Sequence, residues 1–258
     1  MGFKTIMPSP KQDPRKIVEK LRRDRYSNAQ AVYWGGSVAK GEGTEHSDLD
    51  VVVVVDHLPN AYRETFFIGG WPVDVFIHDL ETLNYFFQES RNKSGIPGLL
   101  QMILTGVEII KDTETSKQVK LMAKEAFASG PAPWSTQEID KERFFITDVL
   151  TDILYPVSRS EQIASAAWLY EALSQFYFRA RGKWRASGKS IPRYLETDDP
   201  DLAKQFNQAF AGVFENSETS ALETLVKNIL KPYGGLLWEE YKSDASAECR
   251  LKYTKGTP

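Results

Sequence analysis

Two aspartates that share one face of a predicted strand are the residues best placed to do chemistry. Asp48 and Asp50 stand at the start of an almost continuous run of valines that ends at position 55. Because residues i and i+2 of a strand point to the same face, we expect these two carboxylates to lie side by side. Two like charges held that close need a proton or a cation between them, and carboxylate oxygens favour Mg²⁺ or Mn²⁺. The pair therefore predicts a divalent-cation site.

A third carboxylate lies in a similar setting. Asp74 interrupts an apolar, strand-like segment over residues 72–77, where a lone acid is costly unless it is paired. On a strand adjacent to Asp48 and Asp50, it would complete a cluster of three acids. Such a cluster can hold two metal ions about 3.5–4 Å apart, which clamp the attacking and leaving oxygens of a displacement at phosphorus. The sequence therefore predicts Asp48, Asp50 and Asp74 as catalytic and metal-binding residues.

A glycine-rich turn precedes the aspartate pair. Gly36 and Ser37 follow a short β-prone run over residues 31–34, and backbone N–H groups of such a turn can approach phosphate oxygens closely. Lys40 offers a positive charge to the same anion. A P-loop is excluded because Glu42 and Gly43 occupy the places of its Lys and Ser/Thr, and no G-x-G-x-x-G motif opens a helix here. The turn therefore predicts a phosphate site of another kind.

The elements that must position these residues divide the chain in two. Before about position 111, strand patterns alternate with helical ones, and the all-valine strand is expected to be buried on both faces of its sheet. Beyond that point the helical patterns stand alone, and three capping-box sequences recur. The chain is therefore predicted to be an α+β protein, with a mixed-sheet catalytic domain over residues 1–111 and an all-α bundle over residues 112–258. The expected strands are 31–34, 49–55, 65–68, 72–77 and 106–110; the expected helices of the first part are 14–26, beginning at Pro14, and 80–88, capped by Asp79; the capping boxes pair Ser135 with Glu138, Ser158 with Glu161, and Ser220 with Glu223.

The glycine turn and the acids together resemble a known signature. Gly36-Ser37, then Ser47-Asp48-Leu49-Asp50, then Asp74 resembles the signature of the polymerase-β-type nucleotidyltransferase superfamily. The resemblance implies transfer of a nucleoside monophosphate from a nucleoside triphosphate to a hydroxyl, with Mg²⁺ held by the three carboxylates, two ions being expected and Mn²⁺ an alternative. It also implies that Gly36, Ser37, Lys40 and Ser47 help to bind the nucleotide. Lys40 departs from the pattern, since many members have Arg there and Lys lacks its bidentate grip.

The second half of the chain resembles the aminoglycoside nucleotidyltransferases more loosely, since they too place a helical bundle after a minimal catalytic domain. Six basic residues gather between positions 179 and 193. Gly188-Lys189 and Arg193 match a Gly-Lys and a following basic residue in that family, which implies that Lys189 and Arg193 contact the triphosphate. A solvated basic loop is the alternative interpretation. Glu171, as an acid facing the acceptor, and His46, near phosphate, are weaker candidates.

The composition of the chain argues against several classes of function. The 258 residues carry 32 Lys and Arg against 35 Asp and Glu, a net charge of −3, which argues against general nucleic-acid binding. The single cysteine, Cys249, excludes an intrachain disulfide and a cysteine-based zinc site. No segment has the roughly 20 apolar residues that a membrane span needs, and the first residues do not resemble a signal peptide. A cytoplasmic protein is expected.

The predicted function is Mg²⁺-dependent transfer of a nucleoside monophosphate, AMP from ATP being favoured, to a hydroxyl of a small, antibiotic-like molecule, with release of pyrophosphate. Two alternatives stay open. The acceptor could be a macromolecule, such as a tRNA end or a partner protein in an antitoxin-like system, or the chain could be a non-catalytic nucleotide-binding scaffold. A fused helical ribonuclease toxin is excluded, because resemblance to that class requires an Arg-x4–6-His motif and no histidine follows His78. The sequence leaves undetermined the acceptor, the preferred nucleoside triphosphate, the oligomeric state and the carboxylate that acts as general base.

Overall fold

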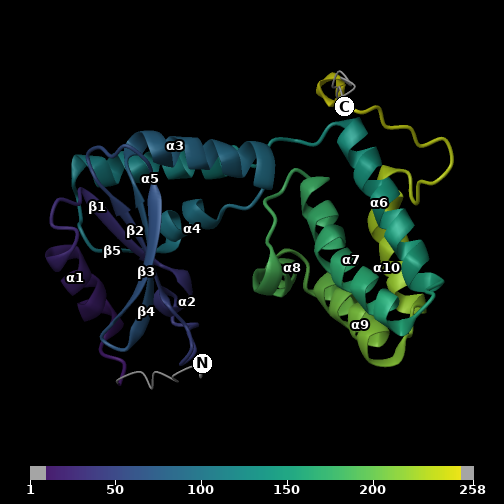
Figure 1. Cartoon of the computed structure of the whole chain (residues 1–258), viewed down its shortest axis with the longest axis horizontal. Helices are drawn as coiled ribbons and strands as arrows, with labels where there is room; N and C mark the ends of the chain where they lie inside the picture. The colour runs from purple at the N-terminus through teal and green to yellow at the C-terminus, as the bar shows by residue number, and fades with distance from the viewer. Residues whose placement is uncertain (1–9, 251–258) are drawn as a thin grey trace, which may run out of the picture. The chain divides into compact units, whose positions relative to one another are not determined.

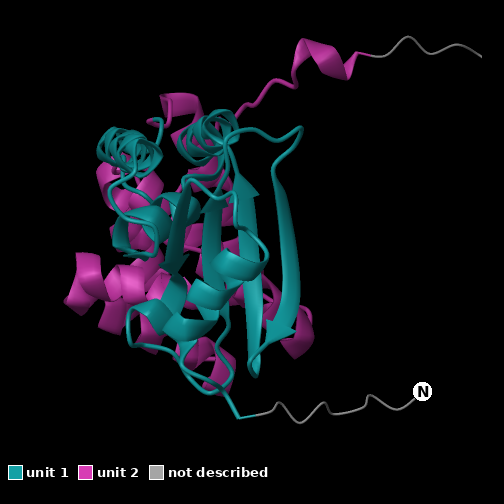
Figure 2. Cartoon of the chain, turned by 90° about the vertical axis from the view of Figure 1, so that its left-hand side faces the viewer, with its two compact units in different colours: residues 1–132, 182–184 teal, residues 133–181, 185–258 magenta. Residues whose placement is uncertain are grey.

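The chain folds into two compact units in a computed structural model that describes residues 10–250 (Figure 2). The first unit contains residues up to 132 together with residues 182–184. The second contains residues 133–181 and the chain from residue 185 onward. Each unit has its own hydrophobic core, and the predicted metal-binding carboxylates Asp48, Asp50 and Asp74 all belong to the first.

A five-stranded mixed sheet forms the centre of the first unit, as the sequence predicted (Figure 1). Its spatial order is β3-β4-β2-β1-β5, and only the pair β2·β4 is parallel while the other pairs are antiparallel. The parallel pair sets the two aspartate-bearing strands side by side at the middle of the sheet. The strands are β1 (Ala31–Gly35), β2 (Leu49–Val54), β3 (Tyr62–Ile68), β4 (Trp71–His78) and β5 (Val107–Glu108).

Helices cover both faces of this sheet. Helix α1 (Pro14–Asp24) packs on one face, where its Ile17 and Leu21 join the core side chains of Val51 and Val53. On the other face, Val52 and its neighbours pack under α3 (Leu80–Glu89), α4 (Gly98–Thr105) and α5 (Glu114–Ala128). The alternate valines of β2 are therefore buried on opposite faces, which confirms the prediction of a doubly buried strand.

The first unit extends past position 111 because α5 packs against α4 and β1. The short segment 182–184 joins it through Trp184, whose indole stacks on Phe127 with ring centroids 5.9 Å apart and donates a hydrogen bond to the Phe127 carbonyl at 3.0 Å. These contacts define units of packing and not of function. The predicted boundary between a catalytic domain and a helical bundle at 111/112 therefore stays a prediction.

Local capping explains where the helices of the first unit begin. Asp13 caps α1 and Pro14 occupies its first turn, where a missing N–H costs nothing. Asp79 caps α3 in a reciprocal capping box with Thr82, as predicted. Three helical segments of this unit were not predicted: α2 (Gly36–Ala39), the π-helical turn η1 (Ser90–Ser94) and α4. Helix α4 is short and nearly all apolar, a pattern in which periodicity does not separate helix from strand.

In its described part the second unit contains helices and connecting loops but no strand, and its core is a single cluster of apolar side chains. Ser135 forms the predicted capping box of α6 with Glu138, and Ser158 caps α7 by accepting a hydrogen bond from the Glu161 N–H. The expected cap at Ser220 is wrong: Thr219 is the N-cap of α10, without a side-chain bond, and Ser220 is the first helical residue. No helix of the described residues is long and apolar enough to cross a membrane. The elements are α6 (Thr136–Leu154), α7 (Arg159–Arg179), η2 (Gly188–Ser190), α8 (Ile191–Asp198), α9 (Pro200–Asn216), α10 (Ser220–Leu230), η3 (Lys231–Tyr233) and η4 (Ala247–Cys249).

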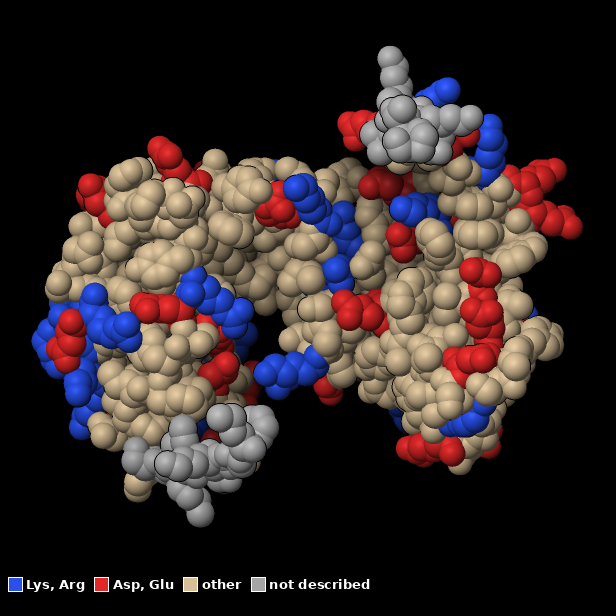
Figure 3. All heavy atoms as spheres, viewed as in Figure 1, with Lys and Arg blue, Asp and Glu red and all other residues tan. Residues whose placement is uncertain are grey.

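Charges of both signs are interspersed over the face shown in Figure 3. Basic side chains gather over α1, which carries five Lys and Arg residues in its sequence PRKIVEKLRRD. Over the second unit, this face shows several acidic patches with fewer basic groups among them. The net charge of −3 is therefore distributed without a broad basic surface on this face.

Candidate active site

Three carboxylates converge at one end of the parallel strand pair. Oxygen atoms of Asp48, Asp50 and Asp74 all lie within 4.8 Å of one another. Asp50 and Asp74 are direct register partners on β2 and β4, and Asp48 comes immediately before β2. The period of two along β2 and the parallel register thus bring all three side chains to the same face. The structure assembles the cluster that the sequence suggested.

Asp74 is the most buried of the three acids and is paired with an arginine. Its side chain is only 7% exposed, and the Arg63 guanidinium on β3 binds both carboxylate oxygens, Nε at 2.7 Å from Oδ1 and Nη2 in contact with Oδ2. The pKa of Arg63 is raised, chiefly by the hydrogen bond to Asp74 and its charge, with Asp50 and Asp48 adding to the shift. A cation of this chain therefore faces the whole acidic cluster.

Gly36 forms the other wall of the cluster. Its φ is +75°, in the left-handed region that favours glycine, and a Cβ built on it would lie 2.1 Å from Oδ2 of Asp50. A side chain at this position would displace the carboxylate or the turn. The glycine therefore allows the backbone at the end of β1 to lie directly against the Asp50 side chain.

The donor set suits a hard divalent cation. Three carboxylates offer six oxygens, the ligand type that Mg²⁺ and Mn²⁺ prefer. Their mutual repulsion requires a positive charge among them, and Arg63 supplies one in this structure. The cluster could therefore hold metal, and its chemistry does not by itself identify which metal.

The remaining predicted nucleotide-binding residues of the first unit lie around the same turn. Ser37 is in α2, and Lys40, exposed, follows that helix as its C-cap. Ser47 closes a tight turn: its Oγ accepts a hydrogen bond from the Thr44 N–H at 2.8 Å, and its carbonyl accepts one from Lys11 Nζ at 2.9 Å. The position of Ser47 is explained by this turn, so its contact with a nucleotide stays a prediction.

The predicted basic residues of the second half belong to the second unit and are not uniform. Lys189 and Arg193 are exposed, on η2 and α8. By contrast, Arg179 is buried against the Trp134 ring, 5.4 Å from its centroid, and Arg181 pairs with Asp198 at 2.8 Å. The interpretation as a solvated loop is therefore wrong for Arg179, whereas the proposed phosphate contacts of Lys189 and Arg193 stay predictions.

The weaker candidates have local partners. Glu171 pairs with Arg185 at 3.2 Å and lines a cavity of about 430 Å³ in the second unit, together with Glu142, whose pKa is raised by burial. His46 is exposed beside Glu45, with its Nε2 3.3 Å from the carboxylate.

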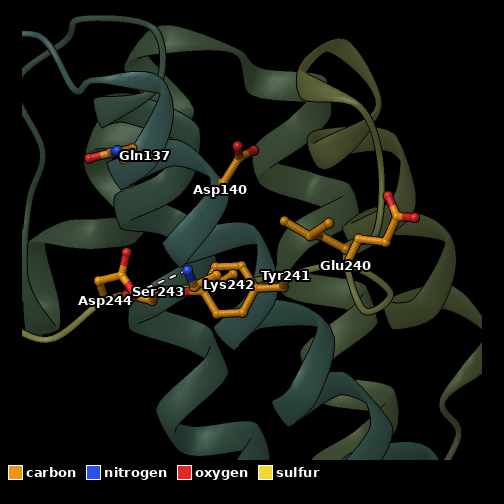
Figure 4. Close-up of a pocket in the computed structure, with 8 residues that line it drawn as sticks. Gln137, Asp140, Glu240, Tyr241, Lys242, Ser243 and Asp244 are labelled. Atoms are coloured by element: carbon orange, nitrogen blue, oxygen red, sulfur yellow. Dashed lines mark ion pairs between the residues drawn. The ribbon is translucent and has the colours of Figure 1, made fainter.

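A second cavity of about 330 Å³, between α6 and residues 237–244, is lined by Asp140 and by an ion pair of Lys242 and Asp244 at 3.5 Å (Figure 4). Neither cavity contains a predicted nucleotide-binding residue.

Arg63 is the site residue that sequence reasoning missed. The predicted strand began at Thr65, which left Arg63 in a loop, whereas β3 begins at Tyr62. In the β3–β4 hairpin, Thr65 is opposite Asp74 and Arg63 opposite Phe76, so Arg63 and Asp74 are diagonal neighbours on one face. The sequence would have indicated this pair if the strands on either side of the Gly69-Gly70 turn had been paired as a tight hairpin and the first strand had been started three residues earlier, at Tyr62.

Comparison with known proteins identifies a domain in the first half of the chain. Residues 14–127 match the family model described as "Nucleotidyltransferase domain". A search of curated proteins found no match. Among solved structures, a nucleotidyltransferase-like protein from Exiguobacterium sibiricum 255-15 is similar, with a TM-score of 0.42 and 12% sequence identity over 84% of this chain and 74% of that one. The family match confirms the resemblance to the polymerase-β-type superfamily over residues 14–127: this part of the chain is a nucleotidyltransferase domain.

Proposed function

We propose that the chain transfers AMP from ATP to a hydroxyl group of a small molecule and releases pyrophosphate, with Mg²⁺ bound by Asp48, Asp50 and Asp74. The observation that carries this proposal is the convergence of three carboxylates within 4.8 Å beside the Gly36 turn, in a nucleotidyltransferase domain. Bound at these oxygens, two Mg²⁺ ions would neutralise the charge of the triphosphate and lower the pKa of the acceptor hydroxyl.

The chain's own groups then have distinct tasks. The backbone of Gly36 and Ser37 receives the triphosphate, and Lys40, Lys189 and Arg193 balance its negative charge as pyrophosphate leaves. Asp74 lies nearest the acceptor and takes up the hydroxyl proton. The acceptor oxygen forms a bond to the α-phosphorus while the α–β phosphoanhydride bond breaks, and the electron pair of that bond leaves with pyrophosphate.

A labelling experiment tests this function. The full chain is incubated with Mg²⁺, ATP labelled at the α-phosphorus and three acceptor pools: aromatic alcohols, amino sugars and total RNA. We expect Mg²⁺-dependent transfer of label to a small molecule, reduced about 100-fold or more in Asp48→Asn and Asp50→Asn, since even outer-shell partners of a metal are worth 10–100-fold. Asp56→Asn is the matched control, because Asp56 is an exposed acid two residues beyond β2.

The outcomes separate the alternatives. Full transfer by Asp48→Asn or Asp50→Asn would overturn the proposed site. Label that appears only on RNA or on protein would replace the small acceptor by a macromolecule. Mg²⁺-dependent ATP binding without any labelled product would favour the scaffold.

A further inference from the structure

An apolar cavity lies on the carboxylate-bearing face of the sheet, beyond Asp74. Its volume is about 440 Å³, within the range of small-molecule sites. The floor is formed by β3 and β4, and α3 and α4 supply the sides. Its lining side chains are mainly apolar, and all belong to the first unit; they include Tyr62, Arg63, Phe76, Phe86, Leu99 and Met102.

The cavity adjoins the third carboxylate. Asp74 and Phe76 are two residues apart on β4 and so point to the same face, about 7 Å apart along the strand. Arg63, which lines the cavity, binds the Asp74 carboxylate directly. A molecule seated on Phe76 would therefore lie within reach of Asp74.

The strand order sets the floor of this cavity apart from the phosphate turn, while Met102 of its α4 wall packs against Gly35, just before that turn. Across the sheet, the turn at Gly36 follows β1, the acids lie on β2 and β4, and the floor of the cavity is formed by β4 and β3. In a displacement at phosphorus, the attacking and leaving oxygens lie roughly in line on opposite sides of the phosphorus. With the triphosphate on the Gly36 side, the β3–β4 floor of the cavity lies across the acids, on the side from which the acceptor approaches.

The lining also restricts the chemistry of the occupant. None of the lining residues is an Asp or Glu, so the lining itself offers a polycation no carboxylate. Its one permanent cation, Arg63, is paired with Asp74. The exposed Phe86 ring, 42% accessible, and the Phe76 ring offer faces and edges on which an aromatic ring can stack.

We propose that this cavity binds the ring system of an uncharged, ring-bearing alcohol and presents its hydroxyl to Asp74. This inference rests on the proposed function and names its acceptor class. It disfavours the polyamino sugars that the aminoglycoside enzymes suggest, because their charge would require acids that the cavity lacks.

The test uses 3-(trifluoromethyl)benzyl alcohol as probe, with ¹⁹F NMR on the full chain. Binding is measured from the ¹⁹F shift without metal, and proximity to the acids from paramagnetic broadening after Mn²⁺ is added. We expect Phe86→Ala and Leu99→Trp to weaken probe binding about tenfold, the first by removing a stacking ring and the second by filling the cavity. Tyr85→Ala is the matched control: Tyr85 is the neighbouring exposed aromatic on α3 and does not line the cavity.

Each outcome has a consequence. Probe binding that is weakened in the two cavity variants and unchanged in Tyr85→Ala, with Mn²⁺ broadening, supports the proposal. Equal binding in all variants, displacement of the probe by adenosine, or tighter binding of a polyamino sugar at this site would overturn it. If water-proton relaxation shows that no Mn²⁺ binds while the cavity variants still lose the probe, the proposed function fails instead, and the acceptor role fails with it.

Discussion

Gly36 is the residue whose replacement tests the closeness of the turn to the acids. Gly36 and Gly41 have nearly the same backbone angle, φ +75° and +76°, so alanine should strain both by about 1–2 kcal/mol. Only at Gly36 would the new Cβ meet the Asp50 carboxylate; at Gly41 nothing lies within 4 Å. We predict that Gly36→Ala weakens Mn²⁺ binding by about tenfold or more relative to Gly41→Ala, measured by water-proton relaxation. Equal affinities would show that the contact with Asp50 is unimportant.

His78, at the end of β4, is expected to make stability depend on pH. Burial lowers its pKa to about 4 from 6.5, against the opposing charge of Asp79. The unfolded chain therefore takes up this proton first as the pH falls, so stability is lost between about pH 6.5 and pH 4.

The expected loss from His78 is about 2 kcal/mol between pH 7 and pH 5. We predict that His78→Asn removes this part of the pH dependence in urea unfolding, whereas His46→Asn, at an exposed loop position, keeps it. If the free energy of unfolding depended on pH equally in the wild type and in His78→Asn, the pH dependence would not come from His78.

At the scale of elements, the helix starts provide a second test. Ser135 caps α6 with a reciprocal capping box, whereas Ser220 is the first residue of α10 and makes no cap. We predict that Ser135→Ala lowers the free energy of unfolding by about 1 kcal/mol. Ser220→Ala should change it by less than about 0.5 kcal/mol. Chemical denaturation of both variants measures the difference, and a larger loss for Ser220→Ala would reverse the assignment.

The elements also show what the sequence could and could not predict. Valine-rich β2, the cap at Asp79 and the acids at positions 48 and 50 were predictable, because local spacing determines them. The segment 98–105 was missed, since a short apolar run has no distinguishing period. Arg63 was missed because its pairing with Asp74 depends on the hairpin register, which is tertiary information. The alternative of a solvated basic loop put Arg179 in solvent, whereas it packs against Trp134, a tertiary contact that local sequence does not show.

At the scale of the whole molecule, the predicted nucleotide-binding residues are divided between the two units. The acids and the glycine turn belong to the first unit, while Lys189 and Arg193 are exposed on the second. If both basic residues contact the triphosphate, the double variant Lys189→Ala/Arg193→Ala should lower kcat/KM for ATP about tenfold or more. Lys204→Ala, another exposed lysine of the second unit, is the control. Unchanged kinetics in the double variant would confine nucleotide binding to the first unit.

The central claim is that Asp48, Asp50 and Asp74 together form a divalent-cation site. It is tested most directly by titrating the full chain with Mn²⁺ and counting bound ions by electron paramagnetic resonance, with a non-hydrolysable ATP analogue present. We predict two Mn²⁺ ions per chain in the wild type and in Asp56→Asn, and loss of tight binding in Asp48→Asn and in Asp50→Asn. Mn²⁺ bound equally by all four proteins, or by none, would contradict the account.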